Sequence, residues 1–221
     1  MTLQEAMKNR HSVRAYEDRP LEEAAAAALE ALIDDCNRES GLHIQLVKNE
    51  PRAFDSTITH YGNFQGVSNY LALIGPKGPD LEELCGYYGE KLVLEAQRLG
   101  LRSCWVALTY RKIPEAFVIG DDEKLTVVIA LGYGLGDGTP HRSKDPEQVC
   151  DSYADAPQWF RDGIDAALLA PTAINQQKFR FYRDGNTVRG KAGLALCSKI
   201  DLGIAKYHFE IGAGRENFHW R

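Results

Sequence analysis

The stretch Arg10-His11-Ser12-Val13-Arg14 lies near the start of the chain, and Ala170-Pro171-Thr172-Ala173-Ile174-Asn175-Gln176-Gln177 lies near its end. Successive side chains of an extended backbone alternate between two faces, so Arg10, Ser12 and Arg14 are expected to share one face. Arginine recognises phosphate and planar polar edges through bidentate hydrogen bonds, which lysine does not form. The first stretch therefore predicts a clamp for a phosphate and an electron-rich ring edge. These five residues leave one alternative open, a solvated basic strand, since charge runs usually lie on the surface.

A capping box precedes this clamp. Thr2-Leu3-Gln4-Glu5 has the Ser/Thr-x-x-Glu form, in which the two side chains satisfy N–H groups at the start of a helix. We expect a short helix from here to about Asn9, which would end directly before the clamp.

The composition bounds the class of protein. The chain has 221 residues, 44% of them hydrophobic, which suffices for one large domain or two small ones with a sizeable core. The net charge of -5 and the scattered basic residues argue against nucleic-acid binding. No apolar run approaches the ~18 residues that span a bilayer, and the first residues lack the apolar core of a signal peptide. The five cysteines are odd in number and contain no CxxC pair, which argues against a disulfide framework or a metal site. We expect a cytoplasmic protein with reduced thiols and no membrane or nucleic-acid partner.

Helical and strand patterns alternate along the chain. The patterns predict helices over residues 21–36, 81–99 and 159–169, and strands over residues 44–47, 69–74, 125–131 and 179–182, the last followed by a hairpin turn at Asp184-Gly185. A layered α+β or α/β fold is therefore expected. The Gly-, Pro- and charge-rich residues 134–155 are typical of a linker, which divides the chain into a first half, 1–150, and a shortened second half, 151–221.

The second half repeats the pattern of the first. A helix, a loop and a strand lead to residues 44–47 in one half and to residues 179–182 in the other. A helix and a glycine-containing connection precede Trp105, and the same spacing precedes Trp220. Chance similarity between two amphipathic helices is the alternative for either match alone; two matches in the same order favour an internal repeat.

With these pieces the chain resembles the FMN-dependent nitroreductase family. It is most similar to the TM nitroreductase-like members that fuse two family halves in one chain, and the resemblance covers nearly all of it. The matching segments are the 10–14 clamp, Leu99-Gly100-Leu101-Arg102-Ser103-Cys104-Trp105, Leu131-Gly132-Tyr133, the 170–177 stretch, Gly86-Tyr87-Tyr88-Gly89-Glu90 and the ending from Asp201 to Glu210. The resemblance implies a nitroreductase-like fold, with a central, mainly antiparallel sheet flanked by helices.

The resemblance also implies how the halves cooperate. In ordinary family members two subunits share a flavin, with the basic clamp from one and the Pro-x-x-x-Asn loop from the other. Here the clamp occurs only before the linker, and the loop that ends in Asn175 occurs only after it. We therefore expect an internal pseudo-dimer, able to exist as a monomer, with one FMN per chain.

Residue roles follow from the same resemblance. The clamp, His11 included, would bind FMN: Arg10 and Ser12 at the phosphate and ribityl chain, and Arg14 near the N1/O2 edge of the ring. Arg142 and Lys144 match the family's distal basic pair on the phosphate. The segment Trp105, Val106, Ala107 and Leu108 would run along the ring, Pro171, Thr172, Ala173 and Asn175 would close its other side, and Tyr61-Gly62-Asn63-Phe64 would approach the pyrimidine edge.

The implied activity is oxidoreduction. NAD(P)H would donate hydride through the flavin to an electron-poor small molecule such as a nitroaromatic or a quinone. Because the cofactor carries the chemistry, no side chain is assigned as a catalytic acid or base. Thr172 replaces the family's usual Ser, and Lys178-Phe179 replaces Pro-Trp, so the face that meets the acceptor is expected to differ. A non-catalytic flavin-binding or storage protein, and a flavin-dependent dehalogenase or flavin-fragmenting enzyme on the same scaffold, are the alternatives.

Overall fold

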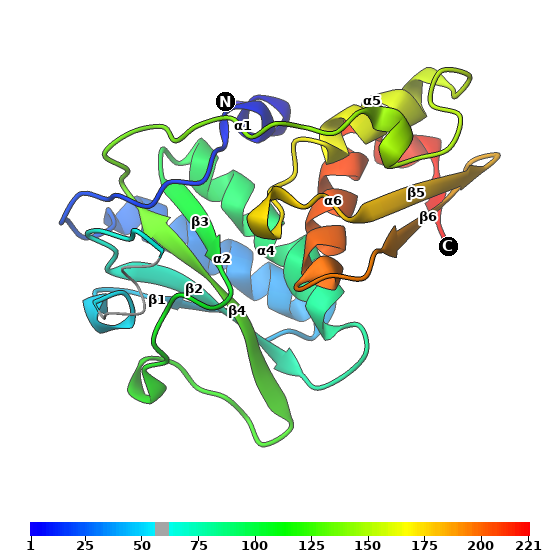
Figure 1. Ribbon diagram of the computed structural model, residues 1–221. Helices are drawn as coiled ribbons and strands as arrows, with labels where there is room; N and C mark the ends of the chain where they lie inside the picture. Colours follow the sequence, from blue (N-terminus) through cyan, green and yellow to red (C-terminus); the bar gives the residue numbers. More distant parts are fainter. Residues whose placement is uncertain (56–61) are drawn as a thin grey trace. The chain divides into compact units, whose positions relative to one another are not determined.

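The computed structural model describes residues 1–55 and 62–221, which form two compact units (Figure 1). One contains the 10–14 clamp and is called the clamp unit; it comprises Arg10–Leu81 and Leu92–Pro140. The other contains the 170–177 stretch and is called the loop unit; it comprises Met1–Asn9, Glu82–Lys91 and His141–Arg221. The last change of unit, between Pro140 and His141, falls inside the predicted linker. The predicted sequence halves, 1–150 and 151–221, stay a prediction.

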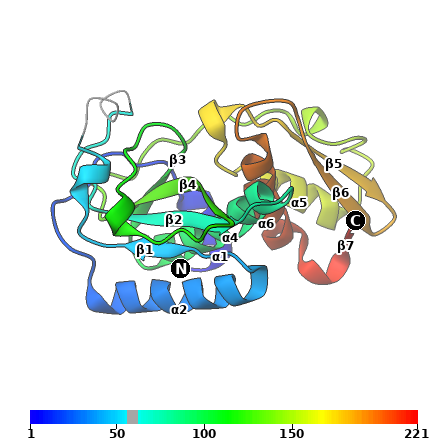
Figure 2. The ribbon, with the colours of Figure 1, turned by 90° about the horizontal axis from the view of Figure 1, so that it is seen from below.

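The clamp unit is built on a four-stranded antiparallel sheet. Its strands follow the order β1-β2-β4-β3, with bounds β1 Gln45–Val47, β2 Asn69–Pro76, β3 Arg102–Val106 and β4 Glu123–Gly132. The central strands β2 and β4 are buried along most of their length, as expected for continuous apolar runs. Helix α2, Glu23–Ser40, lies along one face of the sheet (Figure 2), where its Leu29 packs with Leu131 of β4.

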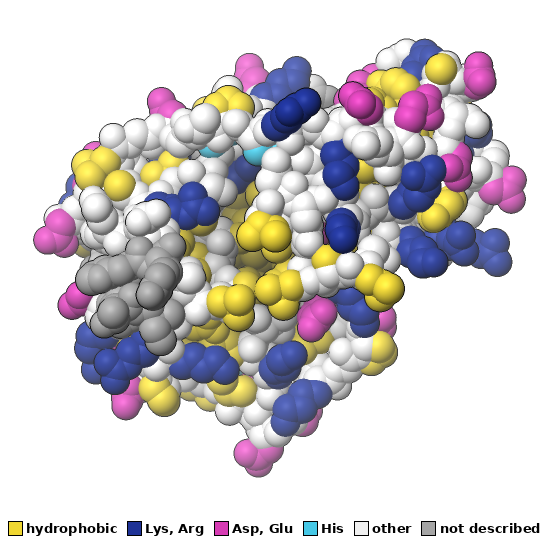
Figure 3. Space-filling model, viewed as in Figure 1, with side chains coloured by type: hydrophobic (Ala, Val, Ile, Leu, Met, Phe, Trp, Pro, Cys, Tyr) yellow, Lys and Arg dark blue, Asp and Glu magenta, His cyan; other side chains and the backbone are white. Residues whose placement is uncertain are grey.

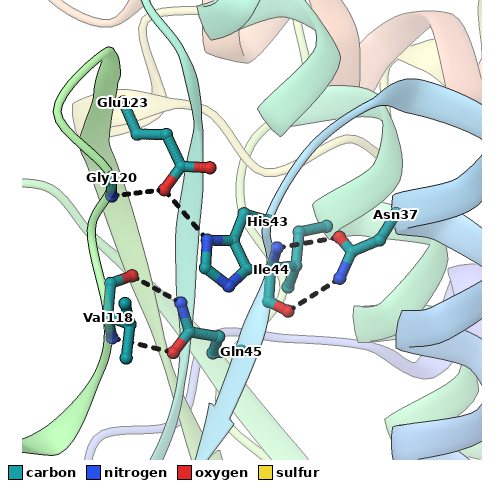
Figure 4. A network of polar contacts seen from close by, with 7 residues as sticks. All are labelled: Asn37, His43, Ile44, Gln45, Val118, Gly120 and Glu123. Atoms are coloured by element: carbon teal, nitrogen blue, oxygen red, sulfur yellow. Dashed lines mark hydrogen bonds and ion pairs between the residues drawn. The ribbon is translucent and has the colours of Figure 1, made fainter.

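Polar side chains fix the edge strand of this sheet (Figure 4). The Asn37 side chain accepts a hydrogen bond of 2.8 Å from the Ile44 N–H and donates one of 3.0 Å to the Ile44 carbonyl. His43 Nδ1 lies 2.9 Å from Glu123 Oε2, which also accepts the Gly120 N–H at 2.7 Å. The contact with His43 and the Gly120 N–H hold the pKa of Glu123 below its usual value. These contacts attach the start of β1 to α2 and to β4.

The loop unit packs helices on a three-stranded sheet. The strands follow the order β5-β6-β7, with β5 Phe179–Asp184, β6 Thr187–Ala192 and β7 His219–Trp220, and the helices are α1 Leu3–Asn9, α5 Gln158–Ala167 and α6 Ser198–Ala213. Helix α4, Leu81–Arg98, contributes Glu82–Lys91 to this unit. Stacked and edge-on aromatic rings fill the core around Phe209. His208 and Glu90, both fully buried, form a contact of 2.9 Å, so this histidine is a packed, hydrogen-bonded residue of the core.

The two units share an order of elements. In each unit a helix is followed by two antiparallel strands, β1–β2 after α2 and β5–β6 after α5, and a further helix then leads to β3 or β7. Strands β2 and β3 are both antiparallel to β4 and hence parallel to each other, as β6 and β7 are. The loop unit thus has the topology of the clamp unit without a counterpart of β4. This agrees with the predicted repeat, while the pseudo-dimer stays a proposal.

The predicted fold class is confirmed, and the element boundaries shift where caps decide them. Thr2 and Glu5 form both bonds of the capping box, at 3.1 and 2.7 Å, and α1 ends at Asn9 as expected. Helix α2 runs past residue 36 to Ser40 because Gly41 adopts the left-handed conformation (φ 72°) that closes a helix. All five cysteines are free. Among residues 1–55 and 62–221, no helix is both long and apolar enough to cross a bilayer.

Candidate functional site

The clamp lies along the edge strand of the sheet. Ser12 forms a parallel bridge with Ser103 of β3, and the Val13 N–H donates a hydrogen bond of 3.0 Å to the Ser103 carbonyl. Val13 is buried in the cluster that contains Cys104 and Val106. Residues 12 and 13 therefore pair with β3 through an isolated bridge, without forming a longer strand. This pairing places the predicted phosphate clamp beside β3, whose end begins the segment predicted to follow the ring.

The clamp residues differ in exposure. Arg10 is 3% exposed, Ser12 is half-buried and Arg14 is exposed, with its guanidinium 5.9 Å from the centre of the Phe64 ring. The expected alternation holds around the buried Val13, whereas Arg10 is more enclosed than a common exposed face implies. A buried arginine is rare and needs acceptors around it. The segment is therefore more than a solvated basic strand.

Cys104 of β3 lies close to the clamp residues Ser12 and Arg14. Burial raises the pKa of its thiol, while the charge of Arg14 and a hydrogen bond with Ser12 oppose the rise. The thiol is thus a protonated core group rather than a nucleophile. Trp105 and Val106 belong to β3, and Ala107 and Leu108 lie in the bend that follows it, with Leu108 exposed.

Gly138, which the sequence did not single out, supports the clamp from the 134–138 loop. Its φ is +76°, and a Cβ built on it would lie 2.9 Å from the His11 Cβ and 2.9 Å from the Ser12 carbonyl oxygen. Glycine is required here for both the backbone conformation and the close approach. Arg102 of β3 holds the same loop through Asp137, with Nη2 and Oδ1 2.5 Å apart.

The second set of predicted residues meets in the loop unit. The Arg142 carbonyl accepts hydrogen bonds from the side-chain amides of Asn175 and Gln177, at 2.9 and 2.8 Å. Lys144 bonds Gln177 twice, through its backbone N–H to the side-chain oxygen and through Nζ to the Gln177 carbonyl, both at 2.9 Å. Thr172 Oγ1 accepts the Gln177 N–H at 3.0 Å. The predicted distal basic pair and the predicted ring-covering loop are thereby tied together, with the buried Gln177 as their common partner.

A polar hollow of about 350 Å³ opens between these segments. Its lining consists of Arg142, Ser143, Lys144, Asp145, Gln148, Asn175 and Gln177. The lining offers a guanidinium, an ammonium group, a hydroxyl and side-chain amides, which are donors that suit phosphate and hydroxyl oxygens. One carboxylate, that of Asp145, is also present.

The 173–177 backbone is strained. Ile174, Asn175 and Gln177 have φ values of 48°, 55° and 45°, in the left-handed region that non-glycine residues seldom adopt. The case of Ile174 is the most unusual, because its side chain is branched at Cβ and 96% exposed. Pro171 precedes this turn and is buried, and Thr172 and Ala173 are half-buried. Such strain persists where surrounding contacts impose it.

One predicted segment is described only in part. Tyr61 lies outside the described residues, and of its neighbours Phe64 is buried in the core of the clamp unit. A role of residues 61–64 at a ring edge therefore stays a prediction.

Comparison with protein families supplies the identity of the fold. The model of the family described as "Putative TM nitroreductase" matches residues 2–213. The chain belongs to this nitroreductase family. Comparison with curated proteins gave no match.

Solved structures of other nitroreductases share the fold of this family member. A structure from Thermotoga maritima, described as a putative nitroreductase, has a TM-score of 0.70 at 22% identity over 98% of this chain and 85% of its own. A putative NADH dehydrogenase/NAD(P)H nitroreductase from Parabacteroides distasonis has a TM-score of 0.52 at 22% identity, over 66% and 95% of the two chains. A putative nitroreductase from Desulfovibrio desulfuricans, solved with FMN, has a TM-score of 0.50 at 15% identity, over 67% and 95%.

Proposed function

We propose that this nitroreductase-family chain is an FMN-dependent oxidoreductase that passes hydride from NAD(P)H to an electron-poor acceptor, such as a nitroaromatic or a quinone. One observation carries the proposal: Asn175 and Gln177 both donate to the Arg142 carbonyl. This joins the loop expected over the ring to the basic pair expected at the phosphate, which are remote in sequence. The donors around the resulting hollow fit the phosphate and ribityl hydroxyls of FMN.

The chain's own residues would bind and orient the cofactor. Arg142 and Lys144 supply positive charge at the hollow, and Thr172 and Asn175 hold the loop that borders it. In the clamp unit, Arg10 and Ser12 would hold phosphate and ribityl oxygens, and the exposed Arg14 would offset negative charge at the ring edge. When bound, FMN supplies hydride transfer between a nicotinamide donor and the acceptor.

Exposed apolar side chains of the loop unit also favour an apolar acceptor. Ile174, Leu194 and Leu196 are 96%, 98% and 64% exposed, and the Leu196 carbonyl is bonded to the Gln176 side chain of the predicted ring-covering loop. Large exposed apolar side chains beside a site are typical of contact with an apolar ligand. This supports aromatic nitro compounds and quinones over small polar oxidants.

A turnover assay tests the proposal. Protein reconstituted with FMN is mixed with NADH or NADPH and a nitroaromatic or quinone acceptor, and nicotinamide oxidation is followed by absorbance. We expect turnover that depends on the acceptor and on FMN. Binding of FMN without reduction by either nicotinamide would instead favour a flavin-storage protein, and loss of halide from a haloaromatic without nitroaromatic turnover would favour a dehalogenase.

A further inference from the structure

A buried carboxylate anchors the predicted ring-covering loop. Asp201 lies in the first turn of α6 and is 2% exposed. Its Oδ1 accepts a hydrogen bond of 3.0 Å from the Ala173 N–H, and its Oδ2 accepts one of 2.7 Å from the Gln176 side-chain amide. Both donors belong to the strained 173–177 turn. Asp201 therefore holds the turn at two points, one on the backbone and one on a side chain.

Gln176 extends this link to a third segment. The same amide nitrogen of Gln176 lies 2.8 Å from the Leu196 carbonyl. One carboxylate and one amide thus join the start of α6, the 173–177 turn and the 193–197 segment. The two loops carry the exposed apolar side chains of Ile174, Leu194 and Leu196, and hydrophobic side chains lie on the surface where these loops are drawn (Figure 3).

Burying a carboxylate at this place costs free energy of folding, so its presence needs an explanation. Burial raises the pKa of Asp201 to about 6, because the hydrogen bonds from Gln176 and Ala173 offset only part of the desolvation of its charge. An aspartate in the first turn of a helix is common on the surface, where its negative charge interacts favourably with the helix dipole. Asp201 is instead buried, and both of its oxygens accept hydrogen bonds from the left-handed 173–177 turn. Its position is therefore explained by its bonds to the turn rather than by the helix dipole.

The geometry points to Asp201 as a positioning residue: it holds the 173–177 turn, through Ala173 and Gln176, in the conformation that places Thr172 and Asn175 for FMN and sets the apolar face for the acceptor. This inference rests on the proposed function. Asp201 does not itself line the hollow and takes no part in the chemistry.

Substitution of Asp201→Asn tests the inference with little change in volume. An asparagine still accepts the Ala173 N–H, but its own NH₂ group faces the NH₂ group of Gln176, so one link is lost. Gln176→Ala, at a half-buried position, removes the same link from the other side and serves if Asp201→Asn does not fold. Asp162→Asn is the matched control, because Asp162 is exposed on α5 of the same unit.

Hydrogen exchange, FMN binding and steady-state kinetics are compared in each variant. Amide hydrogen exchange of the protein without flavin is expected to quicken about tenfold or more over residues 172–177 in Asp201→Asn and Gln176→Ala, with no comparable increase elsewhere in the described chain. The Kd for FMN, from flavin fluorescence, is expected to rise about tenfold, and the KM for an apolar acceptor is expected to rise more than the KM for NAD(P)H. Asp162→Asn should change none of these.

The outcomes separate this inference from the proposed function. If the wild type does not bind FMN, the proposed function fails, while faster exchange in the two variants still supports Asp201 as the anchor of the turn. Unchanged exchange over residues 172–177 in both variants would overturn the inference. So would faster exchange with an unchanged Kd for FMN, because the position of the turn would then not matter for binding.

Discussion

Val13 and Ser103 are joined by a backbone hydrogen bond of 3.0 Å, from the N–H of Val13 to the carbonyl of Ser103. This bond sets the register between the basic clamp and β3. With Val13 buried in the core, its neighbour Ser12 is half-buried and Arg14 is exposed. The clamp is therefore attached to β3, and substitution of the exposed Arg14 is expected to alter binding rather than the fold.

We expect Arg14→Ala to weaken FMN binding and to slow hydride transfer, and Arg10→Ala chiefly to weaken binding. Loss of a hydrogen bond to a charged group in a partly buried site typically costs about 1.5–3 kcal/mol, or roughly ten- to over a hundredfold in Kd. Fluorescence titration with FMN measures the binding, and stopped-flow reduction by NAD(P)H measures the transfer. Arg38→Ala, at an exposed position on α2, is the control. Equal FMN affinity in all four proteins would mean that the clamp is misassigned.

Gly138→Ala is expected to disturb the clamp from outside it. The added Cβ would meet His11 and Ser12 at 2.9 Å, and alanine is strained at a φ of +76°. We expect about 1–3 kcal/mol of destabilisation and weaker FMN binding. Gly136→Ala in the same loop has open space around its Cβ and should be near neutral. Chemical denaturation of the two variants checks the difference, and equal effects would contradict the role given to Gly138.

Much of the fold could be predicted from local patterns. Continuous apolar runs marked β2 and β4, the capping box marked α1, and a three- and four-residue apolar spacing marked α4. Which segments belong to which unit could not be predicted in this way. Met1–Asn9 and Glu82–Lys91 join the C-terminal part of the chain through tertiary contacts, such as that of His208 with Glu90, which leave no periodic signal in the sequence.

Stability is expected to depend on pH through Asp201. Its pKa is raised from 3.8 to about 6, so the folded state binds the proton more tightly than the unfolded state. The resulting stabilisation is fully present below pH 3.8 and is lost as the pH rises through about 6. A pKa difference of this size between the folded and unfolded states corresponds to roughly 3 kcal/mol. Relative to wild type, Asp201→Asn should therefore gain up to that amount in free energy of unfolding between pH 4 and 7. Parallel stability curves for the two proteins would refute the assignment.

Ile174→Asn is expected to stabilise the protein while impairing its use of apolar acceptors. Asparagine tolerates the left-handed conformation at φ 48°, and an isoleucine side chain that is 96% exposed loses little burial when replaced. Relief of the strain is worth about 1 kcal/mol, or a rise in Tm of about 2–4 °C. Leu194→Asn, at an exposed position without a positive φ, is the control for stability. A lower Tm for Ile174→Asn than for Leu194→Asn would show that the conformation is not strained.

The parts of the candidate site differ in how far the sequence alone predicts them. Two arginines around a serine predict a phosphate clamp by residue type and spacing, whereas the role of the Pro-x-x-x-Asn loop is implied by the family resemblance, and both roles stay predictions. Gly138 and Asp201 were not predicted as site residues, because their importance comes from close approach and from burial. In the sequence Gly138 belongs to an ordinary glycine-rich loop, and Asp201 resembles a common first-turn acid. The adjacent Gln176 and Gln177 are a local sequence feature that points to the anchoring of this loop, because both side chains bond the loop to its surroundings.

The central claim is that one FMN is bound per chain by the clamp and the loop together, and flavin stoichiometry tests it most directly. Purified protein is saturated with FMN and freed of excess, and the flavin released by heat is identified by mass and counted against protein. The same measurement is repeated on Arg14→Ala and Asn175→Ala. We predict one FMN per chain in the wild type, retained when light scattering shows a monomer, and a fraction well below one in each variant. Recovery of FAD, a ratio near two, or a full complement of FMN in both variants would contradict the account.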